Sequence, residues 1–453
     1  MKGSKGTFAA LQNDDYRRLW SGSMLATTAF MMSFMLVPSV AFEISGSNAS
    51  AGLAQMGSGI GMFIVSPIGG VIADRVHKKP VVLAGQIIPA LVILATGILI
   101  VTDRITVPIL TAGTLVMGLG FSFMGPARQA WVAELVPRKS LANAIALQQI
   151  AQNISQVAAP LFIAVLIGTV FGIGGAYLFM ASLFVIVLPL TLSLPNTEPS
   201  AGEHRSMRVE LVAGISYVWR DLRLRTLWLG FIGLVVCGFA FQTLLPGLLE
   251  LELGRDPSEI GPIFLVLAVA GLVVNLQLAA VVATKWAGLA LVLTGLTLAA
   301  GFGLVSVAPS YGLALAAAIP LGIGRSGFML VDNALLMSNA DPAYHGRVMS
   351  LAMMGFGSQS LLAPAWGALA DAIGVRQTLG IVGIVAAVIT VIVGLSWFQA
   401  IRQADDHGAD GFDGVDDDED GVDVESAPIV EADTNSETEN GTEGATASRP
   451  MQT

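Results

Sequence analysis

Two opposite charges inside one long apolar run are the side chains of this 453-residue chain most suited to chemistry. Arg325 and Asp332 are seven residues apart, so a helix would place them on one face, about two turns from each other. A charge inside an apolar segment is a candidate for binding or coupling because its burial is costly. The alternative is that each side chain reaches the edge of the segment or pairs locally.

A stripe of amides in the run 142–168 forms a second candidate set. Gln148, Gln152 and Gln156 recur one helical turn apart, with Gln149 and Asn153 beside them. An amide without a partner in hydrocarbon costs a few kcal/mol, so this face must meet water, a substrate or another helix. A cavity lining and hydrogen bonds between helices are both open interpretations, and the same two apply to Asn275.

A charged turn at residues 69–80 separates two long apolar runs. Its candidate residues are Gly70, Asp74, Arg75, Lys78 and Lys79. Glycine permits the tight turn, but the charges need another explanation, either a simple cytoplasmic connection or a switch. A related turn at 281–285 has Thr284 in place of the acid and lacks the paired lysines. This difference favours a role beyond turning.

The composition defines the class of protein that must position these residues. The chain is 54% hydrophobic and 12% charged, with a mean hydropathy of +0.72. Runs of about 20 apolar residues can cross the bilayer core, and only helices satisfy their own backbone there. The predicted fold class is therefore an all-α polytopic membrane protein, with the first run serving as an uncleaved anchor.

Twelve transmembrane helices are predicted in two six-helix halves. The spans are 20–43, 50–73, 80–101, 106–128, 142–168, 172–194, 226–249, 258–283, 287–307, 311–338, 346–370 and 377–398. The predicted parts are a cytoplasmic N-terminal segment, the first half, a cytoplasmic linker with an amphipathic helix, the second half, and an acidic tail expected to be disordered. Their ranges are 1–19, 20–194, 195–225, 226–398 and 399–453.

Repeated motifs indicate that the two halves are duplicated in parallel. Arg17-Arg18-Leu19-Trp20-Ser21-Gly22 recurs 208 residues later as Arg225-Thr226-Leu227-Trp228-Leu229-Gly230. Ala159-Pro160 recurs as Ala363-Pro364 at an offset of 204. Such a duplication is typical of one large class of transporters.

Lysine and arginine predict the orientation. If the N-terminus is cytoplasmic, the inner segments hold 18 of these residues and the outer segments hold 3. Under the positive-inside rule both termini are cytoplasmic, and we expect a multi-pass protein of the plasma membrane. The tail from 399 to 453 holds 16 acids and 2 bases, so nucleic acid is not an expected partner.

The pattern Gly70-x-x-x-Asp74-Arg75-x-x-Lys78-Lys79 between the second and third spans resembles the signature loop of the major facilitator superfamily. The opening Phe8-x-x-Leu11-x-Asn13-x-x-Tyr16-Arg17-x-Leu19-Trp20-x-Gly22 is similar to the start of its enterobactin-exporter and macrolide-efflux branch. The resemblance covers residues 8–398. It implies a secondary transporter with alternating access that exports a small drug-like or siderophore-like molecule, with the proton as candidate coupling ion.

The resemblance also implies a cytoplasmic latch. Asp74 would dock on the start of the eleventh span near Arg347, while Arg75, Lys78 and Lys79 would brace this contact and hold lipid phosphates. The arginine that many proton-coupled members carry in the fourth span is absent from residues 106–127, so the resemblance supports transport more than proton coupling.

Arg128 and Asp332 occupy matching positions in the two halves at the offset of 204. We hypothesise that they form a cytoplasmic gate pair that opens inward. Snorkelling to the interface and local pairing are the alternatives.

Other classes lack the residues they need. Cys237 is the sole cysteine, and no His-Glu-x-x-His or Walker loop occurs, so we expect neither an enzyme, a metal or cofactor, nor ATP drive. The expected partners are a small-molecule substrate and the lipid bilayer. The alternatives are a transport-inactive sensor or scaffold acting through the acidic tail and, with less support, an intramembrane enzyme.

Overall fold

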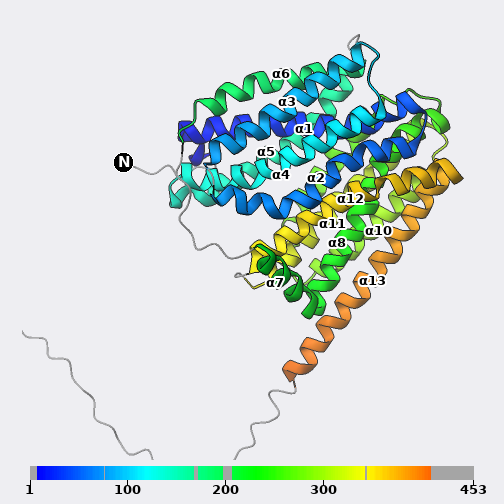
Figure 1. The fold of residues 1–453 in the computed structure, drawn as a ribbon. Coiled ribbons are helices and arrows are strands. Elements are labelled where there is room, and N and C mark those ends of the chain that lie inside the picture. Colours follow the sequence, from blue (N-terminus) through cyan, green and yellow to red (C-terminus); the bar gives the residue numbers. More distant parts are fainter. Residues whose placement is uncertain (1–7, 76, 168–171, 197–206, 342–343, 410–453) are drawn as a thin grey trace, which may run out of the picture. The chain divides into compact units, whose positions relative to one another are not determined.

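A computed structural model describes residues 8–75, 77–167, 172–196, 207–341 and 344–409 (Figure 1). These residues fold into helices without strands. The first six long helices are α1 (Asp14–Ser45), α2 (Asn48–Arg75), α3 (Lys78–Val101), α4 (Val107–Leu135), α5 (Arg138–Ile167) and α6 (Gly172–Leu192). Then follow α7 (Met207–Arg220), α8 (Leu222–Gly247), α9 (Ile260–Leu278), α10 (Ala287–Ser306), α11 (Tyr311–Asn339), α12 (His345–Ile373) and α13 (Val375–Ala409).

The predicted membrane class is confirmed. Ten of the helices in the described residues are long and apolar enough to cross a membrane. The other two long helices, α2 and α12, have 28 and 29 residues, which also exceeds the length needed to cross the core. Several helices continue past the apolar runs, and α13 extends to Ala409, because a helix ends at its cap and not at the membrane boundary.

Local capping fixes where several helices begin and end. The Asn13 side chain accepts a hydrogen bond from the Tyr16 N–H at the start of α1, and Asp221 does the same for Leu224 at the start of α8. Gly46 ends α1 in the left-handed region, at φ 65°. The chain then turns directly into α2.

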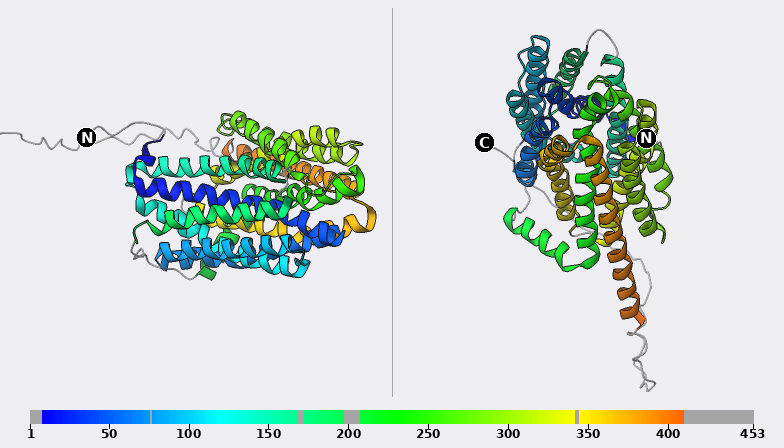
Figure 2. Two further views of the ribbon diagram at one scale, coloured as in Figure 1. Left: turned by 90° about the horizontal axis from the view of Figure 1, so that it is seen from above. Right: turned by 90° about the vertical axis from the view of Figure 1, so that its right-hand side faces the viewer.

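The two halves repeat the same packing, which confirms the six-plus-six prediction. In the first half α6 packs on α1 and α3, and in the second half α13 packs on α8 and α10. The repeated motif explains part of this match. Gly22 faces Val187 of α6 and Gly230 faces Val393 of α13, so the two glycines occupy matching places between the first and last helices of their halves; at Gly230 a Cβ would lie only 2.6 Å from the Val393 side chain. Figure 2 shows the first-half helices running alongside one another.

The helix α7 falls inside the predicted linker and packs on the second half. The ring of Tyr217 stacks on that of Tyr344 at a centroid distance of 4.0 Å, and its hydroxyl accepts a 2.9 Å hydrogen bond from the Asp341 N–H. The tyrosine thus attaches α7 to the connection between α11 and α12. Residues 197–206 of the linker and 410–453 of the predicted tail lie outside the described residues.

Candidate functional site

Two pairs of helices make the most extensive contacts between the halves, and we call them the α2–α12 seam and the α5–α9 seam. The end of the bundle that holds the α1–α2 connection is called the α1–α2 end. The opposite end, with the α2–α3 connection, is called the α2–α3 end. The contacts along these seams decide which end of the space between the halves is closed.

Asp371, in the last turn of α12, caps the start of α2 in the other half. Its carboxylate accepts hydrogen bonds from the Ser47 hydroxyl at 2.6 Å, the Asn48 N–H and side-chain amide at 2.9 Å each, and the Ala49 N–H at 3.0 Å. A helix N-terminus has free N–H groups and a partial positive charge, so an anion is stabilised there. The carboxylate therefore fastens the halves together at the α1–α2 end.

Glycines bring the seam helices into backbone contact. A Cβ atom added at Gly52 of α2 would lie 2.5 Å from the Ala363 carbonyl oxygen of α12, and one at Gly59 would lie 2.6 Å from the Ser360 Cβ. In the α5–α9 seam, a Cβ at Gly261 would lie 2.6 Å from the Ala164 Cα. Larger residues at these positions would push the halves apart.

Helix α8 completes the closure through one contact with α1 and one with α2. The Gln242 side chain donates a 2.5 Å hydrogen bond to the Phe34 carbonyl, and the Thr243 hydroxyl donates one of 2.5 Å to the Gln55 side chain. Beside them is a small cavity, in which the space open to the centre of a water molecule is about 10 Å³. The cavity is lined by Phe30, Phe34, Val37, Gln55, Ser58, Thr114 and Met117. Such a space holds about one water and no organic molecule.

Aromatic rings from four helices form a continuous series near the helix midpoints. Phe121 of α4 stacks on Phe30 of α1 at 4.0 Å, and Phe34, one turn further, meets Phe239 of α8 at 6.3 Å. Phe239 in turn meets Phe356 of α12 at 6.3 Å. The series thus crosses from one half to the other, and Phe34, Phe239 and Phe356 are only half-buried.

Arg325, the middle residue of α11, lies against this series. Its guanidinium carbon is 4.7 Å from the centroid of the Phe239 ring. The adjacent Gly238 leaves space for its stem, because a Cβ there would lie 3.3 Å from the Arg325 Cγ. Asp332, two turns nearer the α2–α3 end, is fully buried, and neither of its carboxyl oxygens has a hydrogen-bond partner in the part of the chain that the structure describes. The two charges do not pair with each other.

The polar side chains of α5 fall into two groups, one packed against α1 and one that is exposed or half-buried. Ser155 is buried, accepts from Thr28 at 3.0 Å and donates to the Met24 carbonyl at 3.1 Å, so this side joins α5 to α1. Gln149 and Gln156 are exposed, while Gln148, Gln152 and Asn153 are half-buried. The Gln149 amide donates to Asn153 at 3.3 Å. Asn275 of α9 is half-buried, with its side-chain oxygen unpartnered.

The lysines of the charged turn contact their own half. Lys78 is buried and lies 3.1 Å from a Glu134 carboxyl oxygen, an ion pair without hydrogen-bond geometry. Lys79 donates to the Leu192 and Leu194 carbonyls at the end of α6, at 2.8 and 2.7 Å. The surroundings of Gly70 and the side chains of Asp74, Arg75 and Arg347 are not among those described, so the cytoplasmic latch stays a prediction.

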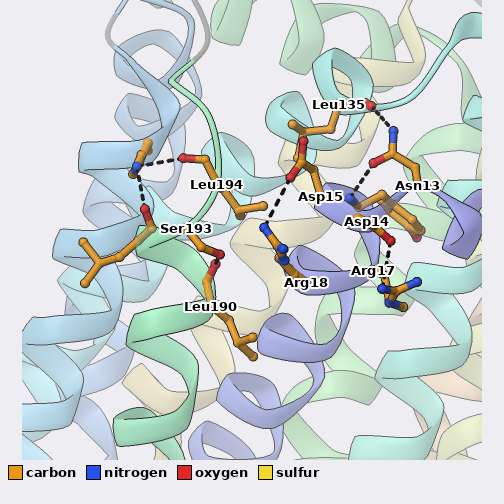
Figure 3. Close-up of polar contacts among 12 residues, drawn as sticks. Asn13, Asp14, Asp15, Arg17, Arg18, Leu135, Leu190, Ser193 and Leu194 are labelled. Atoms are coloured by element: carbon orange, nitrogen blue, oxygen red, sulfur yellow. Dashed lines mark hydrogen bonds and ion pairs between the residues drawn. The ribbon is translucent and has the colours of Figure 1, made fainter.

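Figure 3 shows the neighbouring contacts that hold the start of α1. The Asn13 amide donates to the Leu135 carbonyl at 2.9 Å, and Arg17 pairs with Asp14 at 2.8 Å. Sequence reasoning treated Arg17 as a determinant of orientation, and here it also forms an ion pair within the first turns of α1.

Arg128 and Asp332, the predicted gate pair, do not contact each other in this conformation, so a gate that opens inward stays a prediction. Arg128 donates to the Thr27 hydroxyl at 3.4 Å, and Asp332 has no ion-pair partner among the described residues. Sequence reasoning also missed Asp371, which falls one residue past the predicted span 346–370. One signal could have found it: an acid in the last turn of a helix is unfavourable and needs a partner elsewhere.

Comparisons with known proteins agree with this architecture. The sequence model of the Major Facilitator Superfamily matches residues 19–364. The solved structure of the nucleoside transporter NupG is 13% identical, with a TM-score of 0.71, covering 85% of this chain and 99% of that one. A bacterial homologue of the human lysosomal transporter Spinster, in an inward-facing and unoccupied conformation, is 14% identical, with a TM-score of 0.69 and coverages of 88% and 99%.

A POT family transporter in complex with 5-aminolevulinic acid is also similar, at 13% identity and a TM-score of 0.68, with coverages of 85% and 96%. At these identities the likeness shows the fold. A comparison with curated protein sequences gave no match. The family match, the multi-pass helical fold and the transporters that share it indicate a membrane transporter rather than an enzyme, and the chain belongs to the Major Facilitator Superfamily.

Proposed function

We propose that this protein is a secondary active transporter that exports a small, drug-like or siderophore-like organic molecule by alternating access, driven by protons. The observation that carries the proposal is the closure at the α1–α2 end, where Asp371 and the seam glycines join the halves. With a cytoplasmic N-terminus, the α1–α2 end faces outward. Gln149 and Gln156 are exposed, and we infer that they face a chamber entered from the cytoplasm.

The direction of transport rests on the resemblance of residues 8–22 to an exporter branch. Proton coupling rests on Asp332. A fully buried carboxyl group without a partner among the described residues is costly as an anion, so a proton would neutralise it in the conformation that buries it. A proton taken from one side and released to the other would serve as the coupling ion.

The direct test is flux in proteoliposomes with an imposed pH gradient. A panel of fluorescent amphipathic compounds is offered to vesicles with the acidic side corresponding to the outside of the cell. We expect transport against the substrate gradient that stops when a protonophore collapses the pH difference. Asp332→Asn should abolish the response to pH while keeping the protein folded.

The proposal is overturned if the flux of every compound is independent of the pH gradient and equal to the flux into vesicles without protein. Deletion of residues 405–453 separates the alternative of a scaffold. A transporter keeps its flux without the tail, whereas a protein that acts through its acidic tail loses activity.

A further inference from the structure

Arg325 carries a positive charge that no acid of the described residues neutralises. It is the middle residue of α11, and none of the ion pairs or hydrogen bonds among the described residues includes its guanidinium. The acid on the same face, Asp332, is buried further along the helix and has no partner of its own. A cation in the middle of a membrane helix is costly unless an anion compensates it, so a bound anionic ligand would stabilise Arg325.

The surroundings of Arg325 indicate what other chemical groups such a ligand would carry. Phe239 holds the face of the guanidinium at 4.7 Å, which leaves the N–H groups at its edge available to a carboxylate or phosphate. The rings of Phe34 and Phe356 each meet the Phe239 ring edge-to-face, with centroids 6.3 Å apart in both pairs. All three rings are half-buried, so they present apolar surface beside the charge.

We propose that Arg325 with Phe34, Phe239 and Phe356, called the arginine–aromatic site, binds an amphipathic organic monoanion. The acid group meets the guanidinium edge, and an aromatic or apolar body packs on the rings. This inference rests on the proposed function, because it names the substrate class for that chamber. The anionic group could belong to a soluble molecule or to a lipid headgroup, and the experiment separates the two.

The test is a binding measurement by titration calorimetry on the full chain in nanodiscs of phosphatidylcholine. The probes are 1-naphthaleneacetate and its neutral isostere 1-naphthaleneacetamide. We expect saturable binding of the anion and much weaker binding of the amide. Arg325→Gln should weaken binding of the anion about tenfold to a hundredfold, because a charge-assisted hydrogen-bonded pair is lost, and should leave the amide unchanged. Phe239→Leu should weaken both probes.

The matched control is Arg104→Gln, which removes an exposed arginine from the connection between α3 and α4 and should change neither affinity. Arg325→Lys keeps the charge and should retain part of the affinity for the anion, which gives a second variant if Arg325→Gln does not fold. The proposal is overturned if wild-type protein shows no saturable binding, if the amide binds as well as the anion, or if both Arg325 variants bind like wild type.

Adding phosphatidylglycerol to the nanodiscs distinguishes a lipid headgroup from a soluble substrate as the natural occupant of the site. A soluble substrate site keeps its affinity for 1-naphthaleneacetate in the added lipid. Competition in the wild type that disappears in Arg325→Gln would assign the site to a headgroup and overturn the substrate proposal. Because binding is measured without flux, a protein that binds the anion but transports nothing contradicts the proposed function and leaves the arginine–aromatic site standing.

Discussion

The two seams are related by the internal duplication, yet among the interactions of the described residues the hydrogen-bonded carboxylate cap occurs in the α2–α12 seam. In both, a glycine brings the helices into backbone contact, Gly52 in the α2–α12 seam and Gly261 in the α5–α9 seam. Asp371 then adds four hydrogen bonds to the first seam. Its counterpart at the offset of 204 is Ile167, which has no carboxylate to offer. Close packing was therefore duplicated, while the charged cap belongs to one seam alone.

This difference separates steric fit from electrostatic fastening. The glycine contacts decide whether the halves can meet at the α1–α2 end, and they should act alike in both seams. The Asp371 cap adds stabilisation to the closed arrangement at one seam, because a carboxylate at a helix N-terminus is favourable only while the helices touch. The variants below test these two contributions, from the largest expected shift to the smallest.

The largest effect is expected from filling the glycine contacts. Gly52→Ala and Gly261→Ala each place a Cβ within 2.6 Å of backbone atoms in the opposite half, so closure should be disfavoured by about 3 kcal/mol, or about a hundredfold. Spin labels on Val101→Cys and Val307→Cys in a Cys237→Ala background report the distance between the halves at this end. Gly303→Ala, with nothing within 4 Å, is the control. A shift in one seam variant only would contradict the symmetry of the packing.

A smaller shift is expected from removing the cap. Asp371→Ala leaves the N-terminus of α2 without its acceptor, which typically costs about 1–2 kcal/mol. The population with the α1–α2 end closed should therefore fall about tenfold in the same spin-label experiment. Asp371→Asn keeps one acceptor and should lie between wild type and the alanine variant. An unchanged distance distribution in Asp371→Ala would show that packing alone holds the seam.

A single neutral contact between the halves should matter less. Thr243→Val keeps the shape of the side chain but removes the donor to Gln55, a loss of about 1 kcal/mol. We expect about a fivefold decrease in the closed population, additive with Gly261→Ala because the two sites lie in different helix pairs. A shift as large as that of Asp371→Ala would mean that the α2–α8 contact, and not the cap, dominates closure.

The smallest shift is expected from Lys79→Met, because Lys79 bonds to α6 within its own half. Loss of two charge-assisted hydrogen bonds should lower the free energy of unfolding by about 1–3 kcal/mol, measured by thermal unfolding in detergent. The spin-label distances should stay those of wild type. A clear opening or closing would instead assign Lys79 to the predicted cytoplasmic latch.

Much of the fold could be predicted from the sequence because its signals are local. The length of each apolar run gives a membrane helix, and the motif at Arg17–Gly22 that recurs at Arg225–Gly230 reveals the duplication. The lysine pair shows the limit of this approach. Its pattern suggested one shared role in a latch, but the partner of Lys78 is a glutamate of α4 and the partners of Lys79 are carbonyl oxygens after α6.

The candidate site could be predicted only in part. The charges Arg325 and Asp332 and the amides of α5 are unusual within apolar runs, so the sequence alone identified them. The rings beside Arg325 carried no signal, because phenylalanine is common in any membrane helix and only contact with a cation distinguishes Phe239. The predicted gate pair of Arg128 and Asp332 followed from matching positions; in this conformation Arg128 donates to the Thr27 hydroxyl, and the gate stays a prediction.

The sequence by itself determined that the chain is a duplicated bundle of membrane helices with a few charges at membrane depth, since hydrophobic length and repeated motifs are properties of neighbouring residues. Only the tertiary structure decided which charge meets which partner. Asp371 caps a helix that begins more than 300 residues earlier, and Arg325 stacks on a ring from another helix. Hydrogen bonds and ring contacts act over a few ångströms of space, and the distance between two residues in space follows from how the helices pack.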